Sequence, residues 1–274
     1  MTQTNAAPLR VGLGGLGAIG LPVARWLDGG VPGLELAAVS ANNRERAEER
    51  MGALKTPAPV VGLTELAELA DVVVEGLPPE IFADIAEPAI EAGRIFMPLS
   101  VTSLLARSDL IKRARETGAR IIVPTGALLG LDAVRAAAYG TIHSVVMKTR
   151  KPPRGLQKAT FVVEQGIDVM SLTEPMQLYT GTVTEAAKLF PANVNVACAL
   201  SLAGIGPDKT QYEVWADPGV DRNTHTISVD SDTVTFEMTT GVVPTEENPA
   251  TGKLTPLSVM ATLEGLVNTL KIGT

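Results

Sequence analysis

The residues of this chain whose spacing first suggests chemistry are three glycines near its start. Gly15, Gly17 and Gly20 follow an apolar stretch that we predict to be a buried strand, and they precede a predicted helix. At this spacing the first glycine permits a tight turn, the second lets the main chain approach a pyrophosphate, and the third allows helix and strand to pack closely. The helix start adds N–H groups that lack intrahelical acceptors. We therefore predict a dinucleotide-binding turn, with a ligand-free glycine turn as the alternative. The expected cofactor contacts are Gly15, Gly17, Ala18, Ile19 and Gly20.

The end of the second predicted strand bears on the choice of dinucleotide. An acidic residue at this point usually binds the ribose 2′-hydroxyl of NAD. This chain has Ala41, Asn42, Asn43 and Arg44 there, without a carboxylate. Small polar residues followed by an arginine suit a 2′-phosphate, so Asn42 and Arg44 favour acceptance of NADP, alone or beside NAD. The alternative is that the asparagines form a turn and an N-cap while Arg44 is a solvated helix charge.

Acid–base chemistry near neutral pH has two candidates, because the chain contains only two histidines. His225 stands at the entry to a predicted strand, where a side chain can project into a cleft. His143 lies within an alternating apolar strand, where we expect it to be packed. His225 is therefore the preferred group for moving a proton. Asp217 could orient it, or could simply form a turn with Pro218.

The elements that must position these residues follow two patterns. Strands and helices alternate through the first 124 residues, which is typical of a parallel sheet covered on both faces. There we expect strands at 9–14, 34–40, 71–75, 94–99 and 120–124, and helices at 18–27, 44–54, 64–69, 79–92 and 103–117.

After about residue 125 the strands become longer and alternate in polarity, which favours an open antiparallel or mixed sheet. We expect strands at 141–151, 211–216, 224–229 and 233–239, a hairpin turn at 230–232, helices at 183–190 and 195–203 over one face, and a last amphipathic helix at 256–271. The predicted fold class is α/β: an N-terminal Rossmann domain with a parallel sheet (1–124), an α+β catalytic and dimerisation domain (125–254), and a C-terminal helix (255–274) packing back on the first domain. Because an open sheet needs a cover, we expect a homodimer.

Composition excludes several classes of protein. The net charge of −7 argues against nucleic acid or anionic membrane as a partner, and no apolar run approaches the roughly 20 residues that span a bilayer. Cys198 is the only cysteine, so an intrachain disulfide and a cysteine metal cluster are excluded, and no histidine spacing predicts a metal site. The polar start carries no signal-peptide core. We expect a cytoplasmic protein.

Segments along nearly the whole chain carry a family resemblance. The most specific is an Asn-x-Asn segment ending at Asn195, followed 30 residues later by an Asn-x-His segment ending at His225. The other segments are 15–20, 71–75, 124–132, 143–145, 149–153, 190–196, 217–218 and 248–251. With them the sequence resembles the L-aspartate dehydrogenase family.

This resemblance implies oxidative deamination of L-aspartate to iminosuccinate with NAD or NADP, or the reverse reductive amination, and a role in supplying iminosuccinate for pyridine nucleotide synthesis. It also implies that His225 is catalytic and that Ala127 and Asn195 contact the cofactor. Three positions depart from the family pattern: Ala41 stands where Asp is common, Thr102 replaces a glycine, and Ala250 replaces a lysine.

A dicarboxylic substrate needs cations or convergent N–H donors. The densest basic cluster is 148–154, in which alternation places Lys148 and Arg150 on one strand face and Thr149 and Lys151 on the other. Lys151 is our candidate for binding a substrate carboxylate, with a solvated outer face as the alternative. Arg222 and Thr251 are further candidates. Two other functions stay open: a reductase of another imino or keto dicarboxylate, and a dinucleotide-binding sensor without turnover.

Overall fold

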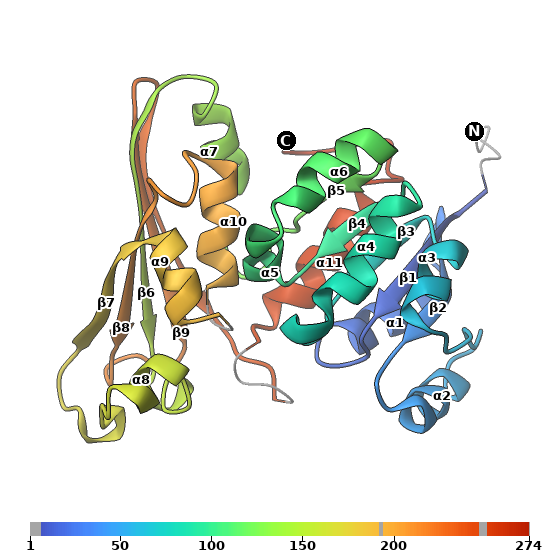
Figure 1. Ribbon diagram of the computed structural model, residues 1–274, viewed down its shortest axis with the longest axis horizontal. Helices are drawn as coiled ribbons and strands as arrows, with labels where there is room; N and C mark the ends of the chain where they lie inside the picture. Colours follow the sequence, from blue (N-terminus) through green and yellow to red (C-terminus); the bar gives the residue numbers. More distant parts are fainter. Residues whose placement is uncertain (1–6, 192–193, 247–250, 274) are drawn as a thin grey trace. The chain divides into compact units, whose positions relative to one another are not determined.

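The computed structural model describes residues 7–191, 194–246 and 251–273. It forms two compact units, Met1–Pro124 with Pro256–Lys271, and Thr125–Thr255 with Ile272–Thr274. Figure 1 shows their helices and strands along the chain. Each unit is built on its own sheet.

The first unit contains a five-stranded parallel sheet in the order β2-β1-β3-β4-β5. The parallel Rossmann-type sheet predicted from the alternation of strands and helices is thus confirmed. Its elements are β1 (Leu9–Gly14), α1 (Gly20–Asp28), β2 (Leu34–Ser40), α2 (Arg44–Gly52), α3 (Leu63–Leu69), β3 (Val72–Glu75), η1 (Pro79–Ile81), α4 (Phe82–Glu91), β4 (Ile95–Pro98), α5 (Val101–Ala106), α6 (Asp109–Thr117), β5 (Arg120–Ile121) and α11 (Leu254–Glu264).

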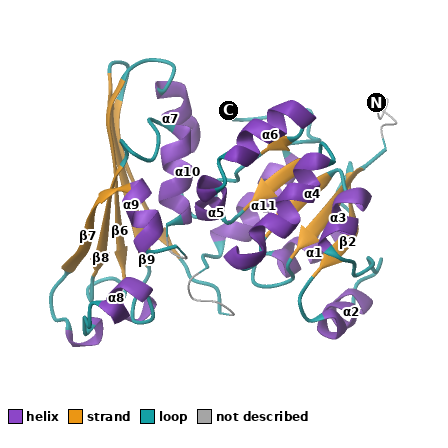
Figure 2. Ribbon diagram, viewed as in Figure 1, coloured by secondary structure: helices purple, strands orange, loops and turns teal. Residues whose placement is uncertain are grey.

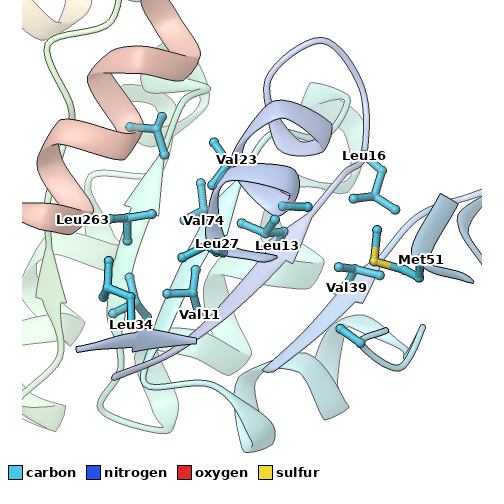
Figure 3. Close-up of a cluster of buried hydrophobic side chains, with 14 of the residues drawn as sticks. Val11, Leu13, Leu16, Val23, Leu27, Leu34, Val39, Met51, Val74 and Leu263 are labelled. Carbon is cyan, nitrogen blue, oxygen red and sulfur yellow. The ribbon is translucent and has the colours of Figure 1, made fainter. Parts of the chain in front are cut away.

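Helices cover both faces of this sheet, and successive residues of a buried strand enter different cores. Val72 and Val74 of β3 pack in one cluster, whereas Val73 packs in the other. The first cluster joins the sheet to α1, α2 and α11, and includes Leu263 of the last helix (Figure 3). The second joins it to α3, α4, α5 and α6. Burial on both faces explains why these strands are apolar throughout rather than alternating.

The helix expected over 79–92 begins as the 3-10 turn η1 before α4, and two other predicted elements of the first unit differ more from the structure. The helix expected over 103–117 is two helices, α5 and α6, because the chain breaks at Arg107, whose guanidinium pairs with Glu87 and Asp109 at 2.9 and 2.8 Å. The strand expected over 120–124 pairs for only two residues. The last ladder hydrogen bond runs from Ile122 N–H to the Phe96 carbonyl, and the next would need an N–H that Pro98 lacks.

The second unit contains a five-stranded mixed sheet in the order β10-β9-β6-β8-β7. Its β6 and β8 are parallel neighbours and its other pairs are antiparallel. The elements are α7 (Leu131–Ala137), β6 (Ile142–Lys151), η2 (Pro153–Gly155), α8 (Thr160–Glu164), η3 (Val169–Ser171), β7 (Met176–Thr182), α9 (Val183–Leu189), α10 (Asn195–Ala203), β8 (Gln211–Ala216), β9 (Asn223–Ser231) and β10 (Thr235–Val242).

The helices α7, α9 and α10 lie along one face of this sheet (Figure 2). On β6 the residues facing them are buried, including Met147, Thr149 and Lys151. The other face carries Lys148 and Arg150, which lie over the ring of Trp215 at 5.8 and 5.2 Å from its centroid. The alternation predicted for 148–151 is therefore confirmed, and one face of the sheet bears charged and aromatic side chains.

Sequence reasoning missed β7 and α8 in this half of the chain, and it misplaced the bounds of β9 (expected at 224–229), β10 (expected at 233–239) and the last helix. β7 is an edge strand with only Leu178 buried, so its polarity pattern is weak. The hairpin turn lies at Asp232 and Thr233, between the Ser231 N–H and the Val234 carbonyl. The last helix ends at Glu264 rather than 271, since Gly265 follows it, and Val259 and Leu263 are its contribution to the first core.

Candidate cofactor and catalytic sites

The predicted glycine turn lies at the carboxyl end of β1, where ligands bind in open α/β sheets. Gly15 has φ +100°, a conformation that side chains disfavour, and its N–H donates to the Ser40 carbonyl at 2.7 Å. A Cβ at Gly15 would lie 2.5 Å from the Gly76 carbonyl oxygen. Both the main-chain conformation and the lack of space therefore require glycine here.

Gly20 and Gly17 differ in what surrounds them. A Cβ at Gly20 would collide with the Gly15 carbonyl, whereas one at Gly17 would have nothing within 4 Å. Gly20 thus lets the helix pack on the turn, and Gly17 leaves open space beside the main chain. Helix α1 begins at Gly20, two residues later than predicted, so Ala18 and Ile19 lie in the turn just before it.

The start of α1 fits a phosphate group. Ile19 occupies the N-cap position without a side-chain capping hydrogen bond. The Leu21 N–H donates to the Gly17 carbonyl at 3.1 Å and Pro22 has no N–H, so the amides of Ala18, Ile19 and Gly20 are the candidates for binding a phosphate. The open space at Gly17 gives a pyrophosphate access to these amides. One cation missed by sequence reasoning also reaches the turn: Arg50 of α2 donates a hydrogen bond to the Leu16 carbonyl. Because 34 residues separate the two in sequence, no local pattern could have shown this contact.

The end of β2 lies beside this turn, since Ser40 pairs with Gly14 in the parallel register. Asn43 caps α2 by accepting a hydrogen bond from the Arg46 N–H at 2.9 Å. Asn42 is exposed, and exposed Arg44 pairs through Nε with Glu48 at 2.8 Å. The capping role considered for the asparagines therefore applies to Asn43, while Asn42 and Arg44 present polar groups to solvent at the same sheet edge.

A buried carboxylate at the end of β3 is a second feature that sequence reasoning missed. Glu75 pairs in register with Gly14 and Pro98, and it is fully buried. Its carboxylate accepts hydrogen bonds from the main-chain N–H of Leu77, Leu99 and Ser100 and from the Ser100 hydroxyl, at 2.9–3.1 Å. Burial raises the Glu75 pKa, while these hydrogen bonds oppose the rise. Glu75 thus ties together the loops that follow β3 and β4.

In the second unit, His225 lies on the helix-covered face of β9 and is only 3% exposed. Thr149 of β6 stands directly opposite it in the antiparallel register. The Thr149 Oγ1 lies 3.0 Å from His225 Nδ1, and Thr149 is itself fully buried. The imidazole is therefore held by a hydroxyl group rather than by a carboxylate.

Lys151 lies two residues beyond Thr149 on the same face of β6 and is 7% exposed. Burial lowers the pKa of Lys151 to about 8. Burial also lowers the pKa of His225, together with the positive charge of Lys151, to about 3. At neutral pH the histidine is consequently neutral and the lysine carries the local positive charge.

Tyr212 of the neighbouring strand β8 completes the buried polar group. It is 1% exposed, and its hydroxyl is hydrogen-bonded to the Thr149 side chain. Burial raises the Tyr212 pKa, the Thr149 hydrogen bond acts in the opposite direction, and the thiol of Cys198 on α10 adds to the rise. Sequence reasoning gave neither Thr149 nor Tyr212 a role, because only the pairing of β9, β6 and β8 brings them to His225.

Of the two roles considered for Asp217, the structure shows the turn: its carboxylate accepts from the Gly219 N–H at 2.8 Å and pairs with Arg150 at 2.7 Å, on the other face of the sheet from His225. The expectation for His143 is wrong. His143 is exposed rather than packed, because the β6 register shifts between Ile142 and Ser144.

The remaining candidates also belong to the second unit. Ala127 follows Gly126 in a turn, and Asn195 is the first residue of α10. Arg222 is exposed and pairs with Asp221 at 3.0 Å. The Thr251 carbonyl accepts from the Thr245 N–H at 2.8 Å. Asn193 and Ala250 lie outside the described residues. Lys151 is the predicted substrate-binding residue that the structure places near His225: it lies on the same face of β6 as Thr149, and its charge lowers the His225 pKa.

Comparisons with known families agree with both halves of the chain. The family described as "Homoserine dehydrogenase, NAD binding domain" matches residues 15–124, and "Aspartate dehydrogenase, C-terminal" matches residues 132–266. A parallel sheet, a glycine turn at the end of β1 and an NAD binding domain match over the same residues define an NAD(P)-dependent dehydrogenase.

Relatives of similar length narrow this class. The L-aspartate dehydrogenase of Bradyrhizobium diazoefficiens is 49% identical over 99% of this chain and 96% of its own. The L-aspartate dehydrogenase 3 of Bordetella bronchiseptica is 49% identical over 99% and 100%. The crystal structure of aspartate dehydrogenase from Thermotoga maritima shares the fold, with a TM-score of 0.71 at 23% identity over 97% and 99% of the two chains. The chain belongs to the L-aspartate dehydrogenase family, whose members are NAD(P)-dependent amino acid dehydrogenases, which confirms the resemblance seen in the sequence.

In the described part of the chain, no helix is long and apolar enough to cross a membrane.

Proposed function

We propose that this chain catalyses the NAD(P)-dependent oxidative deamination of L-aspartate to iminosuccinate, which water converts to oxaloacetate and ammonia, or the reverse reductive amination. The relatives with 49% identity over nearly their whole length are named for this substrate. The observation that carries the proposal is the buried pair of His225 and Thr149 beside the buried ammonium of Lys151.

The nicotinamide, when bound, supplies a two-electron acceptor for the hydride that leaves the substrate Cα. Gly15, Gly17 and Gly20 and the amides of Ala18 and Ile19 would hold its pyrophosphate, which the open space at Gly17 supports. Ala127 and Asn195 are proposed to contact the nicotinamide half, on the family resemblance. These residues bind and orient the dinucleotide.

His225 carries the acid–base work in this proposal. The substrate ammonium must lose a proton before its nitrogen lone pair can form the C=N bond, and hydrolysis of the imine needs a base for the attacking water. His225 is neutral at neutral pH, so the imidazole has one ring nitrogen that can accept either proton. The charges balance: the substrate ammonium gives one proton to His225, Cα gives one hydride to the oxidised nicotinamide, and the protonated imine keeps one positive charge.

Lys151 is proposed to bind a substrate carboxylate. Its ammonium is mostly protonated at pH 7, and burial strengthens its attraction to an anion. A carboxylate bound there would offset the effect of the Lys151 charge on His225, so the pKa of His225 would rise when substrate binds. Carboxylate binding would thereby make the histidine a better base. Arg222 and Thr251 remain weaker proposals for substrate contacts.

The first test is the formation of reduced nicotinamide with L-aspartate, beside D-aspartate, L-glutamate and L-alanine. We expect turnover with L-aspartate alone, and a loss of roughly 100- to 10,000-fold in kcat for His225→Gln with cofactor affinity unchanged. His143→Gln is the matched control, because it removes the other, exposed histidine. Turnover with another dicarboxylate in place of L-aspartate would contradict the proposed substrate. An active His225→Gln variant would contradict the proposed role of the histidine. Dinucleotide binding without any turnover would support a sensor.

We propose that Asn42 and Arg44 allow NADP to be used. Arg44 pairs with Glu48 through Nε, and its guanidinium has further N–H groups that can bind a 2′-phosphate. Arg44→Gln should reduce kcat/KM with NADP by roughly 10-fold or more and leave NAD almost unchanged, since a hydrogen bond to a charged group contributes about 1.5–3 kcal/mol. An equal loss with both cofactors would refute this role.

We also propose a homodimer through the face of the second sheet that bears Lys148, Arg150 and Trp215. This face lies opposite α7, α9 and α10, and an indole ring partly exposed on a sheet is typical of an interface. Light scattering should give twice the chain mass, and a monomeric mass would refute the proposal. The cytoplasm remains the proposed compartment, supported by the single cysteine.

A further inference from the structure

Arg50 connects the second helix of the chain to the glycine turn. It lies in the last turn of α2, is half-buried, and donates a hydrogen bond from its guanidinium to the Leu16 carbonyl. Leu16 and Met51, the next residue of α2, pack in the same buried cluster (Figure 3). The arginine is therefore held at the turn by packing and by a hydrogen bond. Leu16 directly precedes Gly17, where the main chain has open space beside it.

The positive charge of Arg50 has no counterpart on its own helix. Residues three and four positions apart share a helix face, and the residues at these positions before Arg50 are Ala47 and Arg46. The helix ends two residues after Arg50. Arg44 of the same helix, by contrast, pairs with Glu48 at 2.8 Å. Among the residues that the structure describes, no carboxylate pairs with Arg50, so an anion bound beside the turn would supply the missing negative charge.

A phosphate group is the anion that suits this turn. The amides at the start of α1 and the open space at Gly17 fit the pyrophosphate of a dinucleotide. α2 starts just after β2, whose end marks the place of the adenosine ribose in this kind of fold. Because Arg50 connects that helix to the turn, two phosphate groups are candidates: the pyrophosphate, and a 2′-phosphate on the ribose. One guanidinium N–H is used at Leu16, and the others can bind phosphate oxygens.

We propose that Arg50 binds a phosphate group of the dinucleotide, and that its hydrogen bond to Leu16 aims the guanidinium at that group. The inference rests on the proposed use of the glycine turn as the dinucleotide site, and it is independent of the substrate and of the role of His225. The guanidinium contributes both its charge and its N–H groups to the phosphate oxygens. Because the contact with Leu16 already fixes the long side chain, less conformational entropy is lost when the ligand binds.

Calorimetric titration of the full-length protein with NADPH and with NADH tests this contact without turnover. Arg50→Met should weaken the binding of at least one dinucleotide by roughly 10- to 100-fold, the effect of losing a hydrogen bond to a charged group. A loss with both dinucleotides places the guanidinium on the pyrophosphate, which they share. A loss with NADPH alone places it on the 2′-phosphate. Unchanged affinity for both would overturn the inference.

A purely structural role of Arg50 in shaping the turn predicts a different result. It would weaken the binding of adenosine, which carries no phosphate, as much as that of the dinucleotides, and this outcome in ligand-detected NMR would overturn the inference. A phosphate contact should leave adenosine affinity unchanged. It should also make the dissociation constant of the affected dinucleotide less sensitive to salt in Arg50→Met. Arg50→Lys keeps the charge without the planar fork, so it should lose less affinity than Arg50→Met.

Arg115→Met is the matched control. Arg115 is an exposed arginine of α6, a helix that packs in the other core of the first unit, so this variant removes the same charge away from the turn. It should bind both dinucleotides as the unmodified protein does. Gly17→Ala separates the two possible failures. If Gly17→Ala weakens binding and Arg50→Met does not, the role of Arg50 is wrong. If neither variant changes the affinity, the proposed dinucleotide site is wrong as well.

Discussion

Lys151→Met should abolish a rise in the unfolding free energy that we expect between pH 8 and 10.5. Folding lowers the Lys151 pKa from its ordinary value of 10.5 to about 8 because the ammonium is buried. Between pH 8 and 10.5 the unfolded chain binds this proton and the folded chain does not, so stability must rise with pH in that window. A difference of this size, at about 1.4 kcal/mol per pKa unit, corresponds to about 3 kcal/mol. Below pH 8 both states are protonated and the destabilisation is complete.

The measurement is urea unfolding at a series of pH values from 7 to 10.5. The chain has two tryptophans, Trp26 in α1 and Trp215 in β8. A Trp26→Phe background makes fluorescence report the unit that contains Lys151. The unfolding free energy of this reference protein should gain about 3 kcal/mol relative to Lys151→Met across the window. Methionine has a similar length, so the comparison changes the charge more than the packing.

Lys148→Met is the matched control. It removes a lysine of the same strand whose side chain is 39% exposed beside Glu213, on the other face of the sheet. This variant keeps Lys151 and should therefore keep the rise. Parallel profiles for Lys151→Met and the reference protein would refute the reasoning, because they would mean that burial does not shift this proton equilibrium.

Further predictions concern the first unit. Gly17→Ala should fold with almost unchanged stability, since its Cβ meets nothing within 4 Å, yet lose cofactor affinity by roughly 10-fold or more in NADPH titrations. Gly20→Ala should lose both stability and affinity, because its Cβ collides with the Gly15 carbonyl; equal effects of the two substitutions would contradict the assigned roles. Glu75→Gln should lower the unfolding free energy by about 1–3 kcal/mol in urea titrations, because an amide NH2 would face N–H donors, and unchanged stability would show that the four hydrogen bonds do not hold the loops.

Much of the fold could be predicted because its signals are local. The sequence predicts the segments 34–40, 195–203 and 211–216 with the bounds that the structure has. In each of them an apolar run or a helical period is bordered by turn-forming residues. The glycine turn was also local, since Gly15, Gly17 and Gly20 lie within six residues of each other. The parallel arrangement followed from the helices between the strands.

The environment of the histidine could not be predicted in the same way. Thr149 and Tyr212 are 76 and 13 residues from His225, and neither residue type by itself indicates a site. Their meeting depends on β6 standing between β9 and β8, a strand order that the hydrophobic pattern does not specify. The role of Glu75 could not be predicted for a related reason: the four groups that donate hydrogen bonds to its carboxylate come from the loops after two different strands.

The alternation of residues 148–151 gave part of the answer. It placed Thr149 and Lys151 on one face, but alternation alone cannot say which face the helices cover. The structure places the lysine on the covered face, where a charged group costs stability. A solvent-exposed lysine would be easier to accommodate, and an apolar side chain would pack there without that cost. The buried ammonium is explained if it binds an anion, because its water has already been removed when the carboxylate of the proposed substrate arrives. Stability lost at Lys151 and affinity gained for a dicarboxylate would then have one physical origin. Lys151→Met should raise the unfolding free energy at pH 7, where the lysine is charged, and should weaken the apparent affinity for L-aspartate.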